Sequence, residues 1–89
     1  MDNYKLQKIN QEYLECFRGM SDEQLIDAFN REVRNGGWTI TRSFYLSGLH
    51  KEFGNRNYDY SDIGDKGHLS FLKKIKLVGK KIIIDPTDK

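Results

Sequence analysis

The sequence has a single cysteine, Cys16, so no disulfide can form within the chain. It also contains no apolar run close to the roughly 18 residues that a membrane-spanning helix requires. The N-terminal segment MDNYKLQKINQEYLECF lacks the apolar core of a secretory signal peptide. These absences exclude an internally disulfide-linked fold and predict a cytoplasmic protein that does not associate with a membrane.

Residues that bind metals or phosphate are equally scarce. Besides Cys16 there are only His50 and His68, and these three do not follow the spacing of a zinc site. The aspartates of residues 59–65 are three apart, which does not fit an EF-hand loop. The segments NGGW and IGDKGH match neither the dinucleotide-binding nor the P-loop pattern. We therefore expect no metal ion and no cofactor.

Groups for covalent or acid–base catalysis are hard to assemble. His50 follows Ser47 by three residues and Ser43 by seven, so a helix would bring a serine near the imidazole. Such a pair catalyses nothing without an oxyanion site and a pocket. Cys16 stands beside Glu15, and a neighbouring carboxylate disfavours the reactive thiolate. The sequence predicts a protein that is not an enzyme.

Aromatic residues and unevenly distributed charge are what the sequence does offer. Five Phe, five Tyr and one Trp among 89 residues favour one small folded domain over a disordered chain. Residues 1–40 carry five Lys/Arg and seven Asp/Glu, whereas residues 41–89 carry ten and six. Residues 64–84 contain six lysines and a single acid, Asp65, so the C-terminal part of the chain is basic.

Three amphipathic segments predict helices over about residues 3–18, 22–34 and 41–53. The second begins with Ser21 and Gln24, which form the sequence signature of a capping box. Gly48 lies inside the third, where we expect it to admit a closely approaching backbone. The apolar stripes of the three helices comprise Leu6, Ile9, Tyr13 and Phe17, then Leu25, Ile26, Phe29 and Val33, then Tyr45, Leu46, Leu49 and Phe53.

The stretch LKKIKLVGKKIII predicts a β-hairpin with strands at about residues 73–78 and 81–85. Gly79 followed by Lys80 suits a two-residue type II′ turn. Period two places Ile75, Leu77, Ile82 and Ile84 on the side that packs against the helices and leaves Ile83 on the outer side. A helical alternative stays open for residues 68–76, because Leu69, Leu72 and Ile75 are also three apart.

The expected fold class is therefore α+β, with three N-terminal helices followed by a C-terminal β-hairpin. Winged-helix domains share this gross order of elements, so a winged-helix-like outline is possible. The loop at residues 55–68 is long for that outline, and we expect Ile63 to pin its middle to the core.

Two functions compatible with this fold remain. A hairpin has an open edge that invites a protein partner or a second copy of the chain, so a protein-interaction or self-associating module comes first. Nucleic-acid binding through the third helix and the basic hairpin is the alternative. Trp38 is either a binding anchor or a core residue. The candidate binding surface for both functions comprises Arg42, Ser47, His50, Lys51, Lys73, Lys80, Lys81 and Ile83.

Overall fold

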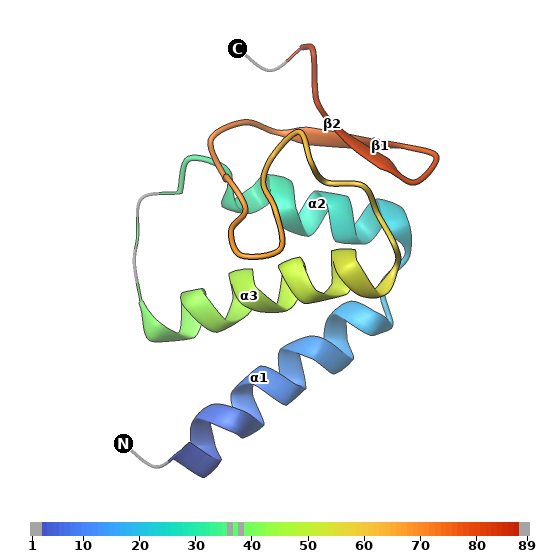
Figure 1. The fold of residues 1–89 in the computed structure, drawn as a ribbon. Helices are drawn as coiled ribbons and strands as arrows, with labels where there is room; N and C mark the ends of the chain where they lie inside the picture. The colour runs from blue at the N-terminus through green and yellow to red at the C-terminus, as the bar shows by residue number, and fades with distance from the viewer. Residues whose placement is uncertain (1–2, 36, 38, 88–89) are drawn as a thin grey trace.

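A computed structural model describes residues 3–35, 37 and 39–87, with side chains from Lys8 onwards. It contains helices α1 (Asn3–Arg18), α2 (Asp22–Glu32) and α3 (Ile40–Asn55), followed by strands β1 (Ile75–Val78) and β2 (Lys81–Ile84) (Figure 1). The predicted α+β fold of three helices and a C-terminal hairpin is confirmed. Trp38 and the side chain of Leu6 lie outside the described part of the chain. In that part, no helix is long and apolar enough to cross a bilayer.

Polar side chains cap the N-terminal ends of α2 and α3, and the cap of α2 is the one that the sequence predicts. At α2 the Gln24 amide donates to Ser21 Oγ (3.1 Å), and the Ser21 amide donates to Gln24 Oε1 (2.9 Å), which completes the capping box. At α3 the Arg42 amide donates to the Thr39 hydroxyl (2.9 Å). These caps satisfy backbone donors that have no partner within the helix.

The helix ends differ from the expected ones by two residues. α2 ends at Glu32 rather than at residue 34, and Arg34 adopts a left-handed conformation (φ 60°). α3 continues through Gly54 to Asn55, and the left-handed residue that follows it is Asn57 (φ 59°). Asparagine tolerates this region better than most residues, so the chain turns there without needing a glycine.

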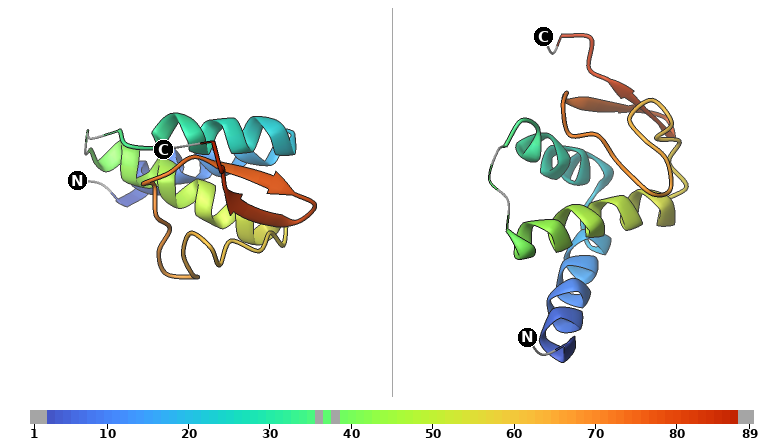
Figure 2. Two further views of the ribbon diagram at one scale, coloured as in Figure 1. Left: turned by 90° about the horizontal axis from the view of Figure 1, so that it is seen from above. Right: turned by 60° about the vertical axis from the view of Figure 1, so that its left-hand side comes forward.

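Figure 2 shows that α1 extends away from the rest of the molecule at its N-terminal end, while its C-terminal end lies near α2 and α3. Most contacts between helices join α1 to α3. The Phe17 ring sits over Gly48, where a Cβ atom would lie 2.9 Å from Phe17 Cε2. Gly48 is thus required because the aromatic side chain of Phe17 packs against it. We expected a neighbouring backbone to approach it instead.

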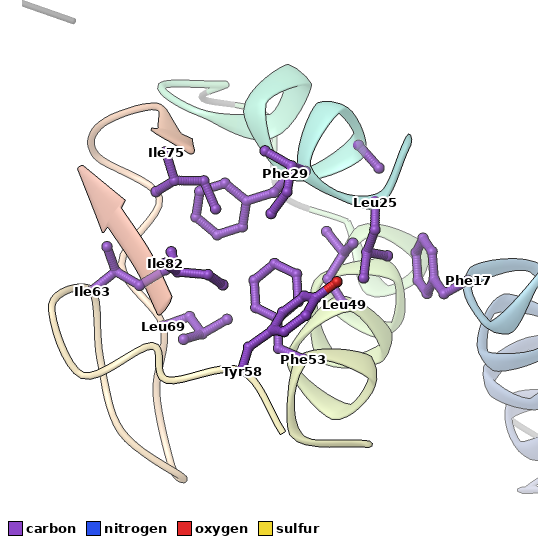
Figure 3. Close-up of a cluster of buried hydrophobic side chains, with 12 residues drawn as sticks. Phe17, Leu25, Phe29, Leu49, Phe53, Tyr58, Ile63, Leu69, Ile75 and Ile82 are labelled. Carbon is purple, nitrogen blue, oxygen red and sulfur yellow. The ribbon is translucent and has the colours of Figure 1, made fainter. Parts of the chain in front are cut away.

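The core joins all three helices to the hairpin and to the segment between α3 and β1 (Figure 3). Aromatic rings fill its centre: Phe29 stacks with Phe53 and with Phe71 at centroid distances of 5.9 and 4.4 Å. Its largest fully buried side chains are Phe17, Phe29, Phe53, Leu25, Leu49, Ile75 and Ile82.

β1 and β2 pair antiparallel, with Ile75 opposite Ile84 and Leu77 opposite Ile82. Gly79 has a φ of 64°, the sign that a type II′ turn requires at its first position. Ile75 and Ile82 are buried, as predicted, but Ile84 is 40% exposed although we expected it to pack on the helices. Ile83, expected on the outer side, is half-buried.

The segment between α3 and β1 is not helical, so the helical alternative for residues 68–76 is wrong. Leu69 forms a β-bridge with Gly64, and both Ile63 and Leu69 are buried, which confirms that Ile63 pins the loop. The bridge requires glycine at position 64, because a Cβ there would lie 2.0 Å from the His68 carbonyl oxygen.

Candidate functional site

The residues predicted for binding on α3 fall into two groups. Arg42 is held by α2: its Nε lies 3.0 Å from Glu32 Oε2, and its Nη2 donates to the Glu32 carbonyl (3.3 Å). Lys51 is exposed on α3. Ser47 and His50 line a groove between α3 and residues 67–72. The third helix therefore does not present its predicted residues as one basic surface.

His50 has a structural partner in this groove. Its Nε2 lies 2.8 Å from the Asp65 carbonyl oxygen, which only accepts, so Nε2 carries the hydrogen. The imidazole also packs edge-on against Tyr60 at a centroid distance of 5.2 Å. The Ser43 hydroxyl donates to the Ile40 carbonyl (2.6 Å), not to His50. These contacts give His50 a structural role, because they hold residues 60–65 against α3.

The lysines of the hairpin turn are also engaged. Lys80 Nζ donates to the Arg56 carbonyl (3.3 Å) and lies 5.7 Å from the centre of the Tyr58 ring. Lys81 Nζ lies 3.4 Å from Asp59 Oδ2 and 3.7 Å from Asp62 Oδ1. Hydrogen bonds from Ser61, with the neighbouring Lys81, lower the pKa of Asp59. The turn thus folds onto residues 56–62, and nearby carboxylates balance part of its charge.

A charged cluster that we did not predict ties together α1, α2 and α3. Arg56 donates from Nη2 to the carbonyls of Phe17 (2.8 Å) and Met20 (2.7 Å) at the end of α1. It also donates from Nε to Glu52 (2.7 Å) and from Nη1 to Asp22 (2.9 Å), and Tyr58 donates its hydroxyl hydrogen to Asp22. We call this cluster the Arg56 junction: Asp22, Glu52, Arg56 and Tyr58 with the two carbonyls.

The protonation equilibria of the Arg56 junction follow from its contacts. The hydrogen bond from Tyr58, followed by that from Arg56, lowers the pKa of Asp22. Burial and the bond to Asp22 raise the pKa of Tyr58. Burial disfavours the charge of Arg56, but the hydrogen bonds to its partners outweigh this and raise its pKa. Because the groups bond to one another, the junction holds the ends of the helices together.

A second unpredicted feature is an apolar surface beside β2. Leu72 is 73% exposed, the largest exposed fraction among the large apolar side chains that the structure describes. It borders a hollow of ≈190 Å³ together with Ile84 and the buried Ile63. We call this surface the Leu72 face and define it by the residues of the hollow: Asp62, Ile63, Ser70, Leu72, Lys73 and Ile84.

The exposure of Leu72 does not result from a loose loop. The Phe71 carbonyl accepts from the Arg34 amide (3.0 Å), and the Leu72 carbonyl accepts from Arg34 Nη1 (3.3 Å). The stacked rings of Phe71 and Phe29 fix the preceding residue in the core. The chain is therefore held on both sides of a leucine whose side chain points into solvent.

The hairpin register shows which backbone groups point away from the two strands. The Asp85 amide donates to the Lys74 carbonyl (2.9 Å), so residues 74 and 85 form a hydrogen-bonded pair. Hydrogen-bonded and non-hydrogen-bonded pairs alternate along an antiparallel ladder. The pairs Ile75–Ile84 and Leu77–Ile82 consequently direct their N–H and C=O groups outward.

Both outward groups of Ile75 and the outward amide of Ile82 have partners within the chain. On β1, the Asn30 side chain donates to the Ile75 carbonyl (3.0 Å) and accepts from its amide (2.8 Å), as a neighbouring strand would. On β2, the Asp59 carbonyl accepts from the Ile82 amide (2.8 Å). The outward groups of Leu77 and Ile84, and the outward carbonyl of Ile82, have no partner among the described residues. Leu77 adjoins a groove whose acids come from α2, whereas Ile84 belongs to the Leu72 face.

Among the predicted residues, the structure brings only Lys73 to the Leu72 face. The threefold spacing of Leu69, Leu72 and Ile75 does not signal this face, because Leu69 and Ile75 are buried and only Leu72 is exposed. Among the described residues, no three His, Cys, Asp or Glu side chains gather as a metal site would require. Neither protein-family models, nor curated proteins, nor solved structures match this chain.

Proposed function

We propose that the chain is a cytoplasmic protein-binding domain and that the Leu72 face is its docking surface. The observation that carries the proposal is the 73% exposure of a leucine whose preceding and own carbonyls both accept hydrogen bonds from Arg34. A solvent-facing leucine beside an apolar hollow and an unpaired strand edge offers the elements that strand addition uses. Apolar burial supplies affinity, and the rim formed by Asp62, Ser70 and Lys73 supplies polar contacts.

The contacts of the basic residues favour a protein partner over nucleic acid. Arg42 is bonded to Glu32, and Lys81 lies near two aspartates. A protein that neutralises phosphates needs lysines and arginines free to replace counterions. An oligonucleotide titration at two salt concentrations separates the alternatives, because phosphate binding weakens by about 0.9 log units per contact for each tenfold rise in salt. We expect no binding of duplex or single-stranded oligonucleotides at low salt.

Photo-crosslinking in an extract of cells that make the protein tests the docking surface. The variant Leu72→p-benzoyl-phenylalanine places the reactive ring on the Leu72 face, and the same substitution at Lys51 provides an exposed control on α3. We expect protein adducts from position 72 and none from position 51. Failure to form an adduct at position 72, or equal adducts at both positions, would contradict the proposal.

A further inference from the structure

The rim of the Leu72 face carries one acid and one base that do not pair with each other. Asp62 and Lys73 line the same hollow, yet no ion pair joins them. Within the part of the chain that the structure describes, Lys73 has no hydrogen-bond or ion-pair partner. Asp62 has Lys81 at 3.7 Å, a contact between exposed side chains that contributes little. The face therefore presents opposite charges side by side.

The apolar part of the face has the same two-sided character. Leu72 protrudes next to the hollow that it borders, so a projection and a depression lie beside each other. In a dimer with two-fold symmetry, every contact occurs twice. If one residue of the first copy touches a different residue of the second copy, the same two residues also meet with the copies exchanged. Under such a rotation, the projection of each copy can enter the depression of the other. In the same way, the acid of each copy can face the base of the other.

The open backbone at Ile84 fixes where two strands could meet. Asp59 occupies the edge of β2 at Ile82, and Pro86, two residues after Ile84, has no N–H to donate. Between these limits the Ile82 carbonyl and the amide and carbonyl of Ile84 remain open among the described residues, and only Ile84 offers both a donor and an acceptor. Two copies of β2 running antiparallel could exchange both groups at Ile84 and form a four-stranded sheet.

From these observations we propose that the partner of the Leu72 face is a second copy of this chain. The two copies pair through β2 at Ile84 about a two-fold axis, and Leu72 of each copy packs into the hollow of the other. Asp62 of each copy faces Lys73 of the other. This inference rests on the proposed function, because it names the occupant of the same face.

Charge reversal combined with mixing tests this arrangement by analytical ultracentrifugation. Asp62→Lys and Lys73→Glu each place like charges at both symmetry-related contacts, so we expect each variant to dimerise at least about tenfold more weakly than the wild type. An equimolar mixture of the two variants restores opposite charges at both contacts, and we expect it to recover the dimer. Lys51→Glu makes the same charge change on α3 and serves as the matched control.

Three results would overturn the inference: a wild type that stays monomeric at millimolar concentration, variants that dimerise as the wild type does, or a mixture that does not recover. Circular dichroism establishes that each variant is folded. If Asp62→Lys does not fold, the comparison of Lys73→Glu with Lys51→Glu still decides, because Lys73 has no partner within the described chain. A monomeric wild type that still forms adducts with another protein at position 72 would refute the dimer and leave the proposed function standing.

Discussion

At the Arg56 junction every charged group faces a partner, whereas the Leu72 face leaves a leucine, a lysine and a strand edge exposed. Both regions are held by similar means, since an arginine binds backbone carbonyls in each: Arg56 those of Phe17 and Met20, Arg34 that of Leu72. They differ in what the fixed backbone presents. At the junction the neighbouring side chains bond to one another, and at the Leu72 face the leucine turns outward. Rigidity in one region thus holds the helices together, and in the other it keeps the proposed docking surface in shape.

The largest change in stability should come from Arg56→Ala. The substitution leaves Glu52, which is 4% exposed, without its ion-pair partner and removes the donor to the carbonyls of Phe17 in α1 and Met20 just after it. Breaking a buried ion pair by removing one partner costs about 3–5 kcal/mol of unfolding free energy. Urea denaturation measures the loss, and Lys51→Ala on α3 is the control, expected within about 0.5 kcal/mol of the wild type. If Arg56→Ala lowered the unfolding free energy by as little as Lys51→Ala, the contrast between the two regions would disappear.

Asn30→Ala should have an intermediate effect and should open the second edge of the hairpin. Its amide satisfies both outward backbone groups of Ile75, and unsatisfied buried groups cost about 1–3 kcal/mol. We expect faster hydrogen exchange at the Ile75 amide, measured by NMR, than at the Ile82 amide. Asp27→Ala on the exposed side of α2 is the control. Unchanged exchange at Ile75 would show that Asn30 does not close this edge.

Acid should loosen the Arg56 junction, because protonation of Asp22 weakens its hydrogen bonds with Arg56 and Tyr58. The pKa of Asp22 is lowered in the folded state from an ordinary value of 3.8. Its contribution to stability is therefore complete above that value and is lost as the pH falls through the folded-state pKa. We expect the unfolding free energy of the wild type to fall more steeply below pH 4 than that of Asp22→Asn. Parallel pH profiles for the two proteins would contradict this role of Asp22.

The smallest effect on the stability of the monomer should come from Leu72→Ser. The side chain is mostly in solvent, so the unfolding free energy at high dilution should change by no more than about 0.5 kcal/mol. Leu69→Ala, three residues earlier and buried, should by contrast cost about 2–5 kcal/mol. Thermal unfolding followed by circular dichroism measures both. A large loss for Leu72→Ser would mean that the leucine serves the fold and not a partner.

The sequence predicts those parts of this fold that depend on local pattern. The capping box at Ser21, the glycine of the hairpin turn and the pairing of Leu77 with Ile82 follow from spacing and backbone preference over a few residues. The Arg56 junction could not be predicted in this way, because Arg56 lies 34 residues from Asp22 and 39 from Phe17 in the chain. Long-range hydrogen bonds between polar side chains leave no periodic signal.

The candidate site was harder to predict for a related reason. Counting lysines identified a basic surface, but charge in a sequence does not reveal whether a carboxylate such as Asp59 or Glu32 lies beside it. Period two put Ile84 on the packed side of the hairpin, where its neighbour Ile75 is indeed buried. Whether a helix reaches far enough to cover the last residue of a strand depends on tertiary packing, and here it does not.

The late position of β2 in the sequence has a consequence for how the protein is made. Ile82 is fully buried at the centre of the core, yet it follows all three helices in the sequence. A ribosome therefore synthesises α1, α2 and α3 before it adds the strand that completes their common interior. Until then the helices expose Phe29 and Phe53, and a nascent chain that stalls before Ile82 is a substrate for chaperones and proteases.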